Sequence, residues 1–301
     1  MTNGTSQGLF IVVAIVIFGI FVGISYTVFG DTLSPKMETL FNQAIETVNL
    51  RGGNIEETIY PEPTYAGYFT TVENSSGITI TEYIGTDSDV VIPKEIDNKP
   101  VTVIDGYSFR WKNLSTVIIP NTVTEIGSEA FGYNNLTKVN IPESVTKIGR
   151  YAFNENKLTE ITLPSKLTEI DEGVFFKNQL AKVTIPDSVV RIRFSAFSDN
   201  NLTEIELPKS LTLIDTDAFK RNKLTKVNIP NSVTKIGEYA FFFNSLTEVT
   251  IPDSVATIGS YAFYGNNLTE VEIHENTVYT VYTTKGDRPS FDGPVTIKKR
   301  K

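Results

Sequence analysis

A unit of 22 residues repeats without insertion between Val101 and Ile273, and it constrains the fold more than any other feature. One phenylalanine per unit marks the repeat: Phe109, Phe131, Phe153, Phe175, Phe197, Phe219, Phe241 and Phe263. A proline keeps the same step from Pro120 to Pro252. So strict a period predicts a solenoid, in which each unit buries its apolar face only against its neighbours.

The apolar positions within a unit predict two short strands. The first strand carries the L-x-x-L-x-L spacing of a leucine-rich repeat, as in Leu136, Val139 and Ile141. Its alternation with polar residues is typical of a strand with one buried face. The proline that follows has no N–H to continue a β-ladder. A second alternation, at Val145 and Ile148, predicts a strand on the opposite wall of the coil.

The rest of each unit predicts a corner. Glycine or aspartate, as at Gly149 and Asp171, is followed by two variable residues and usually by Ala-Phe. Because a helix N-cap tolerates both glycine and aspartate, we expect the Ala-Phe pair in a single helical turn. Each coil would then run strand, turn, strand, helical turn.

An asparagine closes each unit, at Asn134, Asn156, Asn178, Asn200, Asn222, Asn244 and Asn266. A buried amide persists only when its hydrogen bonds are made, and stacked amides can bond the backbone of the neighbouring coil. We therefore expect a buried structural ladder. The same repeat generates Asn-Leu-Thr triplets, such as the one at Asn135, and glycosylation there is the less favoured alternative.

The unit L-T-x-V-x-I-P-x-S-V-T-x-I-G-x-x-A-F resembles the BspA-like class of bacterial leucine-rich repeats, a family of cell-surface proteins. The stretch ahead of it, from Gly67-Tyr-Phe to Val90-Val-Ile-Pro, is similar to the family's usual opening. The resemblance implies a β-rich leucine-rich repeat solenoid with short helical turns over residues 101–273, after an N-terminal β cap over 66–100. It also implies an extracellular location of the repeats and a role in adhesion or protein binding, with a protein ligand or a host or cell-surface receptor as partner.

The C-terminal residues 274–301 depart from the period. Alternating apolar residues and two turn signals predict short strands that cap the last coil, with the apolar positions Val278, Val281, Val295 and Ile297. We expect the final Lys298 to Lys301 to be a solvated basic tail.

Composition excludes several classes of function. The chain has a net charge of −8 and a pI near 4.9, which argues against nucleic acid as a partner. It has no cysteine, so no disulfide or thiolate site, and its one histidine is His274. We expect no enzyme activity, no cofactor and no metal. Asp87 and Asp89 are a weak alternative as calcium ligands, and carboxylates such as Asp171 and Asp217 are expected to be solvated.

The N-terminal segment ahead of the repeats contains a stretch that could cross a membrane. Residues Gly8 to Phe29 carry no charge and are apolar over the roughly 20 residues that cross a bilayer. We expect a single-pass transmembrane helix within an anchor over 1–33. The alternative is a cleaved signal peptide, although no Lys or Arg precedes the segment. An amphipathic helix is predicted over 34–53 and a linker over 54–65.

This arrangement leaves a second functional class open. An apolar span, an amphipathic helix and a β-rich domain, in that order, are also the layout of type IV pilins. A pilin-like surface assembly subunit is therefore an alternative to a membrane-anchored binding protein. A structural spacer without a ligand is another.

The outward position before the buried strand residue alternates in charge along the repeats, at Thr116, Lys138, Glu160, Lys182, Glu204, Lys226, Glu248 and Glu270. In a parallel ladder the equivalent residues of neighbouring units are adjacent, so opposite charges meet. We interpret this column as a device for register and solubility, with ligand binding as the alternative.

Five variable aromatic residues lie in the last two units: Tyr239, Phe242, Phe243, Tyr261 and Tyr264. Stacked coils bring equivalent positions within about 5 Å, so these rings are expected to form one patch, rimmed by Lys235 and Glu238. Such a composition is typical of a binding hot spot. We predict that a protein ligand docks here; the alternative is that the rings only shield the corner of the coil.

Overall fold

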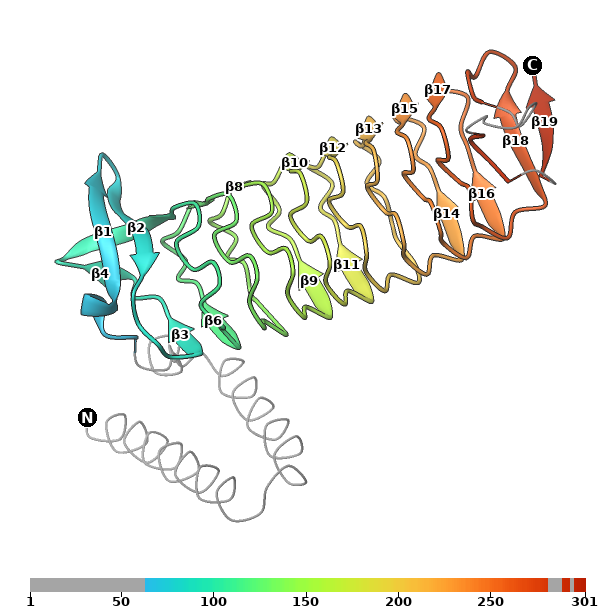
Figure 1. Cartoon of the computed structure of the whole chain (residues 1–301). Helices are drawn as coiled ribbons and strands as arrows, with labels where there is room; N and C mark the ends of the chain where they lie inside the picture. The colour runs from blue at the N-terminus through green and yellow to red at the C-terminus, as the bar shows by residue number, and fades with distance from the viewer. Residues whose placement is uncertain (1–62, 281–288, 293–294) are drawn as a thin grey trace, which may run out of the picture. The chain divides into compact units, whose positions relative to one another are not determined.

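The computed structural model describes residues 63–280, 289–292 and 295–301. They form a solenoid whose coils stack in sequence order, each crossing two walls of parallel β-structure (Figure 1). The leucine-rich repeat solenoid predicted from the period is confirmed.

The first wall is built from the strands that precede the prolines. Its strands are β3 (Asp89–Val91), β6 (Thr116–Ile118), β9 (Glu160–Thr162), β11 (Lys182–Thr184), β14 (Lys226–Asn228), β16 (Glu248–Thr250) and β18 (Glu270–His274). They pair in parallel as β3–β6, β9–β11 and β14–β16; the partners in the last two pairs lie one repeat of 22 residues apart, whereas β3 and β6 lie 27 residues apart. Residues 138–140 and 204–206 form no strand, so the pairing is interrupted between β6 and β9 and between β11 and β14, and β16 does not pair with β18.

The second wall is the one predicted from the Val145 and Ile148 alternation. Its strands are β5 (Lys99–Ile104), β7 (Glu125–Ile126), β8 (Lys147–Ile148), β10 (Glu169–Ile170), β12 (Arg191–Ile192), β13 (Leu213–Ile214), β15 (Lys235–Ile236) and β17 (Thr257–Ile258). They pair in parallel in the orders β5-β7-β8 and β10-β12-β13-β15-β17. Within each of the two sheets the buried isoleucines lie opposite their equivalents, as Ile170 does Ile192.

The fixed phenylalanines form a continuous stack through the core. All eight are at most 1% exposed, and neighbouring rings lie with centroids 5.0–5.9 Å apart. The stack continues into both caps, because Tyr83 lies against Phe109 at 5.5 Å and Phe291 against Phe263 at 5.3 Å. Aromatic stacking of this kind adds to the free energy of area burial, and here it links every coil to the next.

The asparagine ladder is also confirmed. The side chain of Asn200 accepts a hydrogen bond from the N–H of Leu180 at 3.0 Å and donates to the carbonyl oxygens of Phe175 and Phe197 at 2.9 and 3.2 Å. The other asparagines of the column likewise accept at Oδ1 from a leucine N–H and donate from Nδ2 to phenylalanine carbonyl oxygens, at Asn134, Asn156, Asn178, Asn222, Asn244 and Asn266. Each amide therefore joins two coils.

The predicted helical turn at the corner is wrong. Among the described residues the only helix is η2 (Ala66–Tyr68), a 3₁₀ turn in the N-terminal cap. The corner instead consists of overlapping turns, with bonds from Ala152 N to Gly149 O and from Asn154 N to Tyr151 O. Tyr151 has a φ of +56°, which an α-helix does not contain.

Glycine in the corner has a steric reason. A Cβ on Gly149 would lie 2.6 Å from the backbone nitrogen of Ser128 in the preceding coil, so the two backbones could not approach this closely. Glycine and aspartate favour tight turns as well as N-caps, which is why the sequence pattern did not distinguish the two.

Both ends of the solenoid are covered by strands. At the N-terminal end, β1 (Phe69–Asn74) pairs antiparallel with β2 (Gly77–Tyr83), β2 pairs with β5, and β4 (Glu95–Ile96) pairs with β5. At the C-terminal end, β19 (Thr296–Arg300) pairs in parallel with β18.

The basic run is not a free tail, because Lys298 and Arg300 belong to β19, but Lys298, Lys299 and Lys301 are exposed as expected. Lys298 forms an ion pair with Glu270 at 2.7 Å, and Arg300 donates to the carbonyl oxygen of Ile251 at 2.6 Å and pairs with Asp253 at 2.9 Å. The basic residues thus fasten the last strand to earlier coils.

The predicted anchor over 1–33, the amphipathic helix over 34–53 and most of the linker over 54–65 lie outside the described residues. No helix within 63–280, 289–292 or 295–301 is long and apolar enough to cross a membrane.

Candidate functional site

Two positions of every corner hold the backbone in the left-handed region. They lie two residues before and two residues after the fixed phenylalanine, as Tyr239 (φ +55°) and Phe243 (φ +50°) do around Phe241. Left-handed φ costs an L-residue roughly 1–2 kcal/mol, and other units place Gly173 and Gly265 at these positions. A bulky ring here is not required by the fold, so its presence is a reason to consider function.

The structure brings all five predicted site residues together on this corner, and we call them the aromatic corner patch. Tyr239 stacks on Tyr261 at 5.1 Å, Phe242 lies 4.2 Å from Phe243 and 6.0 Å from Tyr264, and Tyr261 lies 5.4 Å from Tyr264, all between ring centroids. Phe243 is 47% exposed and the other four are partly buried. The patch is therefore an accessible surface of touching rings.

Glycine shapes the exposed edge of the aromatic corner patch. A Cβ on Gly265 would overlap the ring of Phe243, and Gly265 itself has a φ of +74°. The absence of a side chain at Gly265 leaves the space that the ring of Phe243 occupies beside the next coil. The ring is thus held in place although nearly half of it faces solvent.

We predicted that Lys235 and Glu238 form the rim of the patch, but that prediction did not include Lys220, which contacts the rings. The ammonium of Lys220 lies 5.3 Å from the centroid of Tyr239 and 5.9 Å from that of Phe242, and pairs with Asp217 at 3.1 Å. Lys220 occupies the same position of its unit as Phe242 does one unit later, which is the signal that would have found it.

Asp217 departs from the expectation of a solvated carboxylate. Its side chain is 15% exposed, and burial raises its pKa above the ordinary value, while the hydrogen bond from Lys220 opposes that shift. The carboxylates Asp171 and Glu172, also expected to be solvated, are 29% and 32% exposed.

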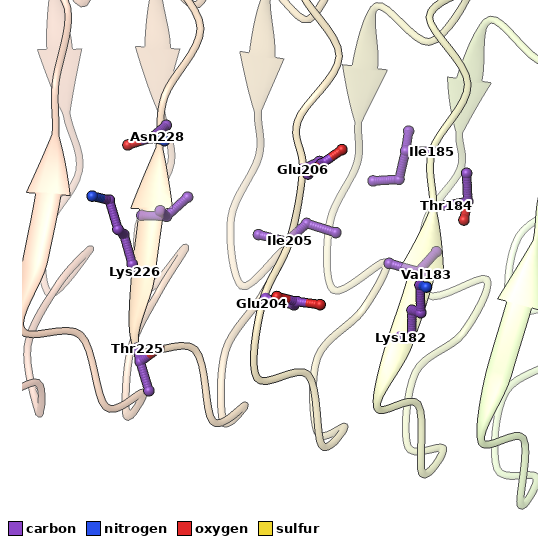
Figure 2. Close-up of a pocket in the computed structure, with 11 residues that line it drawn as sticks. Lys182, Val183, Thr184, Ile185, Glu204, Ile205, Glu206, Thr225, Lys226 and Asn228 are labelled. Carbon is purple, nitrogen blue, oxygen red and sulfur yellow. The ribbon is translucent and has the colours of Figure 1, made fainter.

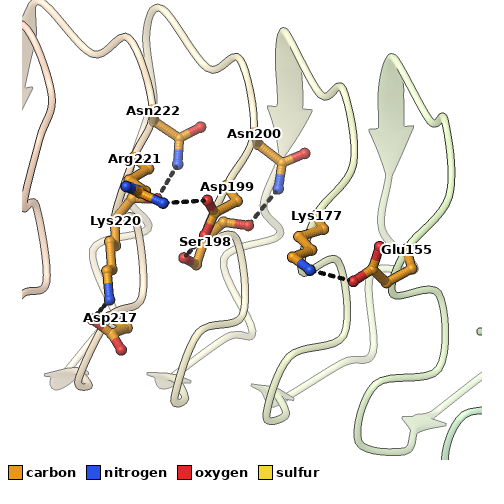
Figure 3. Close-up of polar contacts among 9 residues, drawn as sticks. All are labelled: Glu155, Lys177, Ser198, Asp199, Asn200, Asp217, Lys220, Arg221 and Asn222. Carbon is orange, nitrogen blue, oxygen red and sulfur yellow. Dashed lines mark hydrogen bonds and ion pairs between the residues drawn. The ribbon is translucent and has the colours of Figure 1, made fainter.

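Beside the patch the corner becomes polar and contains a pocket of about 330 Å³. Figure 3 shows how its charged side chains pair: Lys177 with Glu155, Arg221 with Asp199 at 3.7 Å, and Lys220 with Asp217. The hydroxyl of Ser198 also donates to Asp199 at 2.8 Å. The first two pairs join neighbouring coils, and the third lies within one coil.

The strand face carries a shallow groove of about 540 Å³ where the first wall is interrupted, lined by residues 182–185, 204–206 and 225–228 (Figure 2). The predicted alternating ion pairs form in part. Lys138 pairs with Glu160 at 3.9 Å and Lys226 with Glu248 at 3.1 Å, whereas Lys182 and Glu204 form no ion pair with the residues that the structure describes. This face offers exposed charges and few apolar contacts.

No set of three or more His, Cys, Asp or Glu side chains in the described part of the chain could hold a metal ion. The weak calcium candidate Asp89 instead accepts a hydrogen bond from the hydroxyl of Thr116 at 2.6 Å. The single histidine, His274, lies in β18 and accepts a bond from the N–H of Asn276 at 3.2 Å.

Comparison with known proteins gives the same assignment of fold. A leucine-rich repeat protein from Eubacterium ventriosum ATCC 27560 is 23% identical, with a TM-score of 0.51 over 71% of this chain and 66% of its own. One from Bacteroides ovatus ATCC 8483 is 23% identical, with a TM-score of 0.50 over 73% and 66%. A leucine rich cell surface protein from Faecalibacterium prausnitzii A2-165 is 26% identical, with a TM-score of 0.46 over 71% and 83%. No curated protein sequence matches significantly.

The family model for the BspA type leucine rich repeat region matches six copies of the repeat, over residues 102–224 and 169–284. These matches together span more than half of the chain and coincide with the stacked coils. The chain therefore belongs to the BspA-type leucine-rich repeat family.

Proposed function

We propose that this protein binds a protein partner through the aromatic corner patch. The observation that carries the proposal is the cluster of five touching rings, with Phe243 nearly half exposed, on a backbone that favours glycine at three of the five positions. Large rings account for much of the binding energy at protein interfaces and do so best when they are already ordered. The patch meets both conditions.

The strand face is the less favourable surface for a protein. Its exposed residues are Lys, Glu, Thr and Asn. Lys and Glu are depleted at interfaces, and some of these charges already pair with each other, as Lys226 does with Glu248. Surface ion pairs of this kind contribute little free energy, typically about 0–1 kcal/mol. The alternating charges of the strand face, such as Lys226 and Glu248, are better explained as a means of aligning the coils.

We further propose that the repeats are displayed on a bacterial cell surface and are anchored through residues 8–29. This part of the proposal rests on the uncharged apolar segment and on the resemblance to a surface family. Deleting residues 1–33 should release the protein from the membrane fraction after high-speed centrifugation, with the circular dichroism of the repeats unchanged. Full-length protein that stays in the supernatant without detergent would refute the anchor.

Site-specific crosslinking in the producing cell tests the binding site. The photoreactive residue p-benzoylphenylalanine replaces Phe243 in one variant and Lys182 in the matched control; both positions are exposed, one on each face. We expect a discrete protein adduct from position 243 that disappears with the additional change Phe242→Ser. Adducts from position 182 alone would assign the interface to the strand face, and no adduct from either would favour a spacer.

A further inference from the structure

A second group of exposed rings lies at the other end of the same corner. Tyr107, Trp111 and Tyr133 are 56%, 64% and 38% exposed. All three have left-handed φ angles, between +58° and +63°, at the positions that Tyr239 and Phe243 occupy in their units. Together with Arg110 we call them the Trp111 platform. It is separated from the aromatic corner patch by the polar corner of the middle units.

The rings of the Trp111 platform surround a fixed cation. The guanidinium of Arg110 lies 3.8 Å from the centroid of Trp111, 5.0 Å from that of Tyr133 and 5.4 Å from that of Tyr107. Its Nε lies 2.9 Å from Oε2 of Glu129, so the charge is already compensated. Cation–π contacts and an ion pair thus hold the rings in position before any ligand arrives.

This arrangement restricts the charge of a ligand. A cation between the rings would be repelled by Arg110. An anion would compete with Glu129 for the guanidinium of Arg110, whose side chain is only 23% exposed. A neutral ligand meets neither obstacle. It would find apolar ring faces together with polar edges, since tyrosine hydroxyls and guanidinium N–H groups are hydrogen-bonding groups.

A pyranose ring has matching chemistry, because one face presents C–H groups while hydroxyls project from its edge. The spacing also fits a chain of such rings. Trp111 and Tyr133 lie one coil apart, with centroids 5.4 Å apart and planes inclined by 53°. This separation is comparable to the length of one sugar residue, and the inclination suits a chain that twists between residues. We propose that the Trp111 platform binds a neutral β-linked polysaccharide, with consecutive sugars on Trp111 and Tyr133.

The chain contains a direct reporter, because Trp111 is its only tryptophan. The full-length protein is titrated with cellohexaose and with chitohexaose, in a polyoxyethylene detergent, since glucoside and maltoside detergents carry sugar headgroups themselves. We expect a saturable change in tryptophan emission with at least one hexasaccharide. Tyr133→Ala retains the reporter and should weaken the affinity at least fivefold.

Calorimetric titration extends the test to variants that lack the reporter. Trp111→Ala should abolish the binding heat, Trp111→Phe should retain part of it, and Phe194→Ala, an exposed ring elsewhere on this corner, should leave the affinity unchanged. Circular dichroism of each variant verifies folding. The proposal is overturned if neither hexasaccharide changes the tryptophan emission, or if binding survives Trp111→Ala in folded protein. It is also overturned if only heparin binds, which would indicate an anionic ligand, or if only deca-proline binds, which would indicate a peptide ligand.

Discussion

The ring of Tyr239 stacks on that of Tyr261, its equivalent one repeat later, with centroids 5.1 Å apart and planes inclined by 18°. Inside the coil, Phe241 stacks on Phe263 at 5.2 Å and 8°. One repeat spacing therefore sets both stacks, and only burial distinguishes them. The surface rings are ordered by the scaffold rather than by a ligand, which lowers the entropy that binding must overcome.

The buried and exposed rings should respond differently to truncation. Phe197→Ala, in a middle coil, should lower the free energy of unfolding by about 3–5 kcal/mol, because neighbours fixed in register cannot close the cavity. Phe243→Ala should cost under about 1 kcal/mol, since its ring is exposed and the new residue lies at a strained φ in either case. Urea denaturation followed by circular dichroism measures both, and equal losses would contradict the assignment of inside and outside.

The asparagine ladder can be tested at a single rung. Asn200→Ala should lower the free energy of unfolding by roughly 2–5 kcal/mol, because the buried N–H of Leu180 and the carbonyl oxygens of Phe175 and Phe197 lose their partner. The adjacent Asn201→Ala is the control and should stay within about 0.5 kcal/mol. If both substitutions cost the same, the ladder does not stabilise the fold.

Much of this architecture was predictable from the sequence. Apolar residues recur every 22 residues, and each coil buries the same positions of its unit. Leu136, Val139 and Ile141 indicated one wall, and Val145 and Ile148 the other. The corner was not predictable, since glycine and aspartate favour a tight turn and a helix N-cap alike. The role of Lys298 was missed for a different reason: a basic run at a terminus is typical of solvated tails, and only the pairing of β19 with β18 shows that it continues the solenoid.

The candidate site was predictable only in part. The shared positions of Tyr239 and Tyr261 in the repeat predicted their contact, because the period alone determines which residues meet. The cation–π contact of Lys220 depends on the direction of a long side chain, which no spacing specifies. The interruptions of the first wall at 138–140 and 204–206 have no evident cause in the sequences of those units.

Burial of Tyr151 has a consequence at alkaline pH. Desolvation, with a hydrogen bond to Glu172 at 3.0 Å, raises its pKa from 10.0 to about 12. A raised pKa in the folded state means that the contribution to stability is complete below pH 10 and is lost as the pH rises from about 10 through 12. The absorbance difference at 295 nm between wild type and Tyr151→Phe should titrate near pH 12. A midpoint near 10 would show that the hydroxyl is solvated.

The most direct test of the central claim compares two double variants for binding to the protein captured from position 243. Phe242→Ser with Phe243→Ser removes two rings of the aromatic corner patch, and Lys182→Glu with Glu204→Lys reverses the unpaired charges of the strand face. Surface plasmon resonance should show at least a hundredfold loss of affinity for the first variant and less than a threefold change for the second, with both melting temperatures close to that of the wild type. Retained affinity in the first variant with loss in the second would contradict the account.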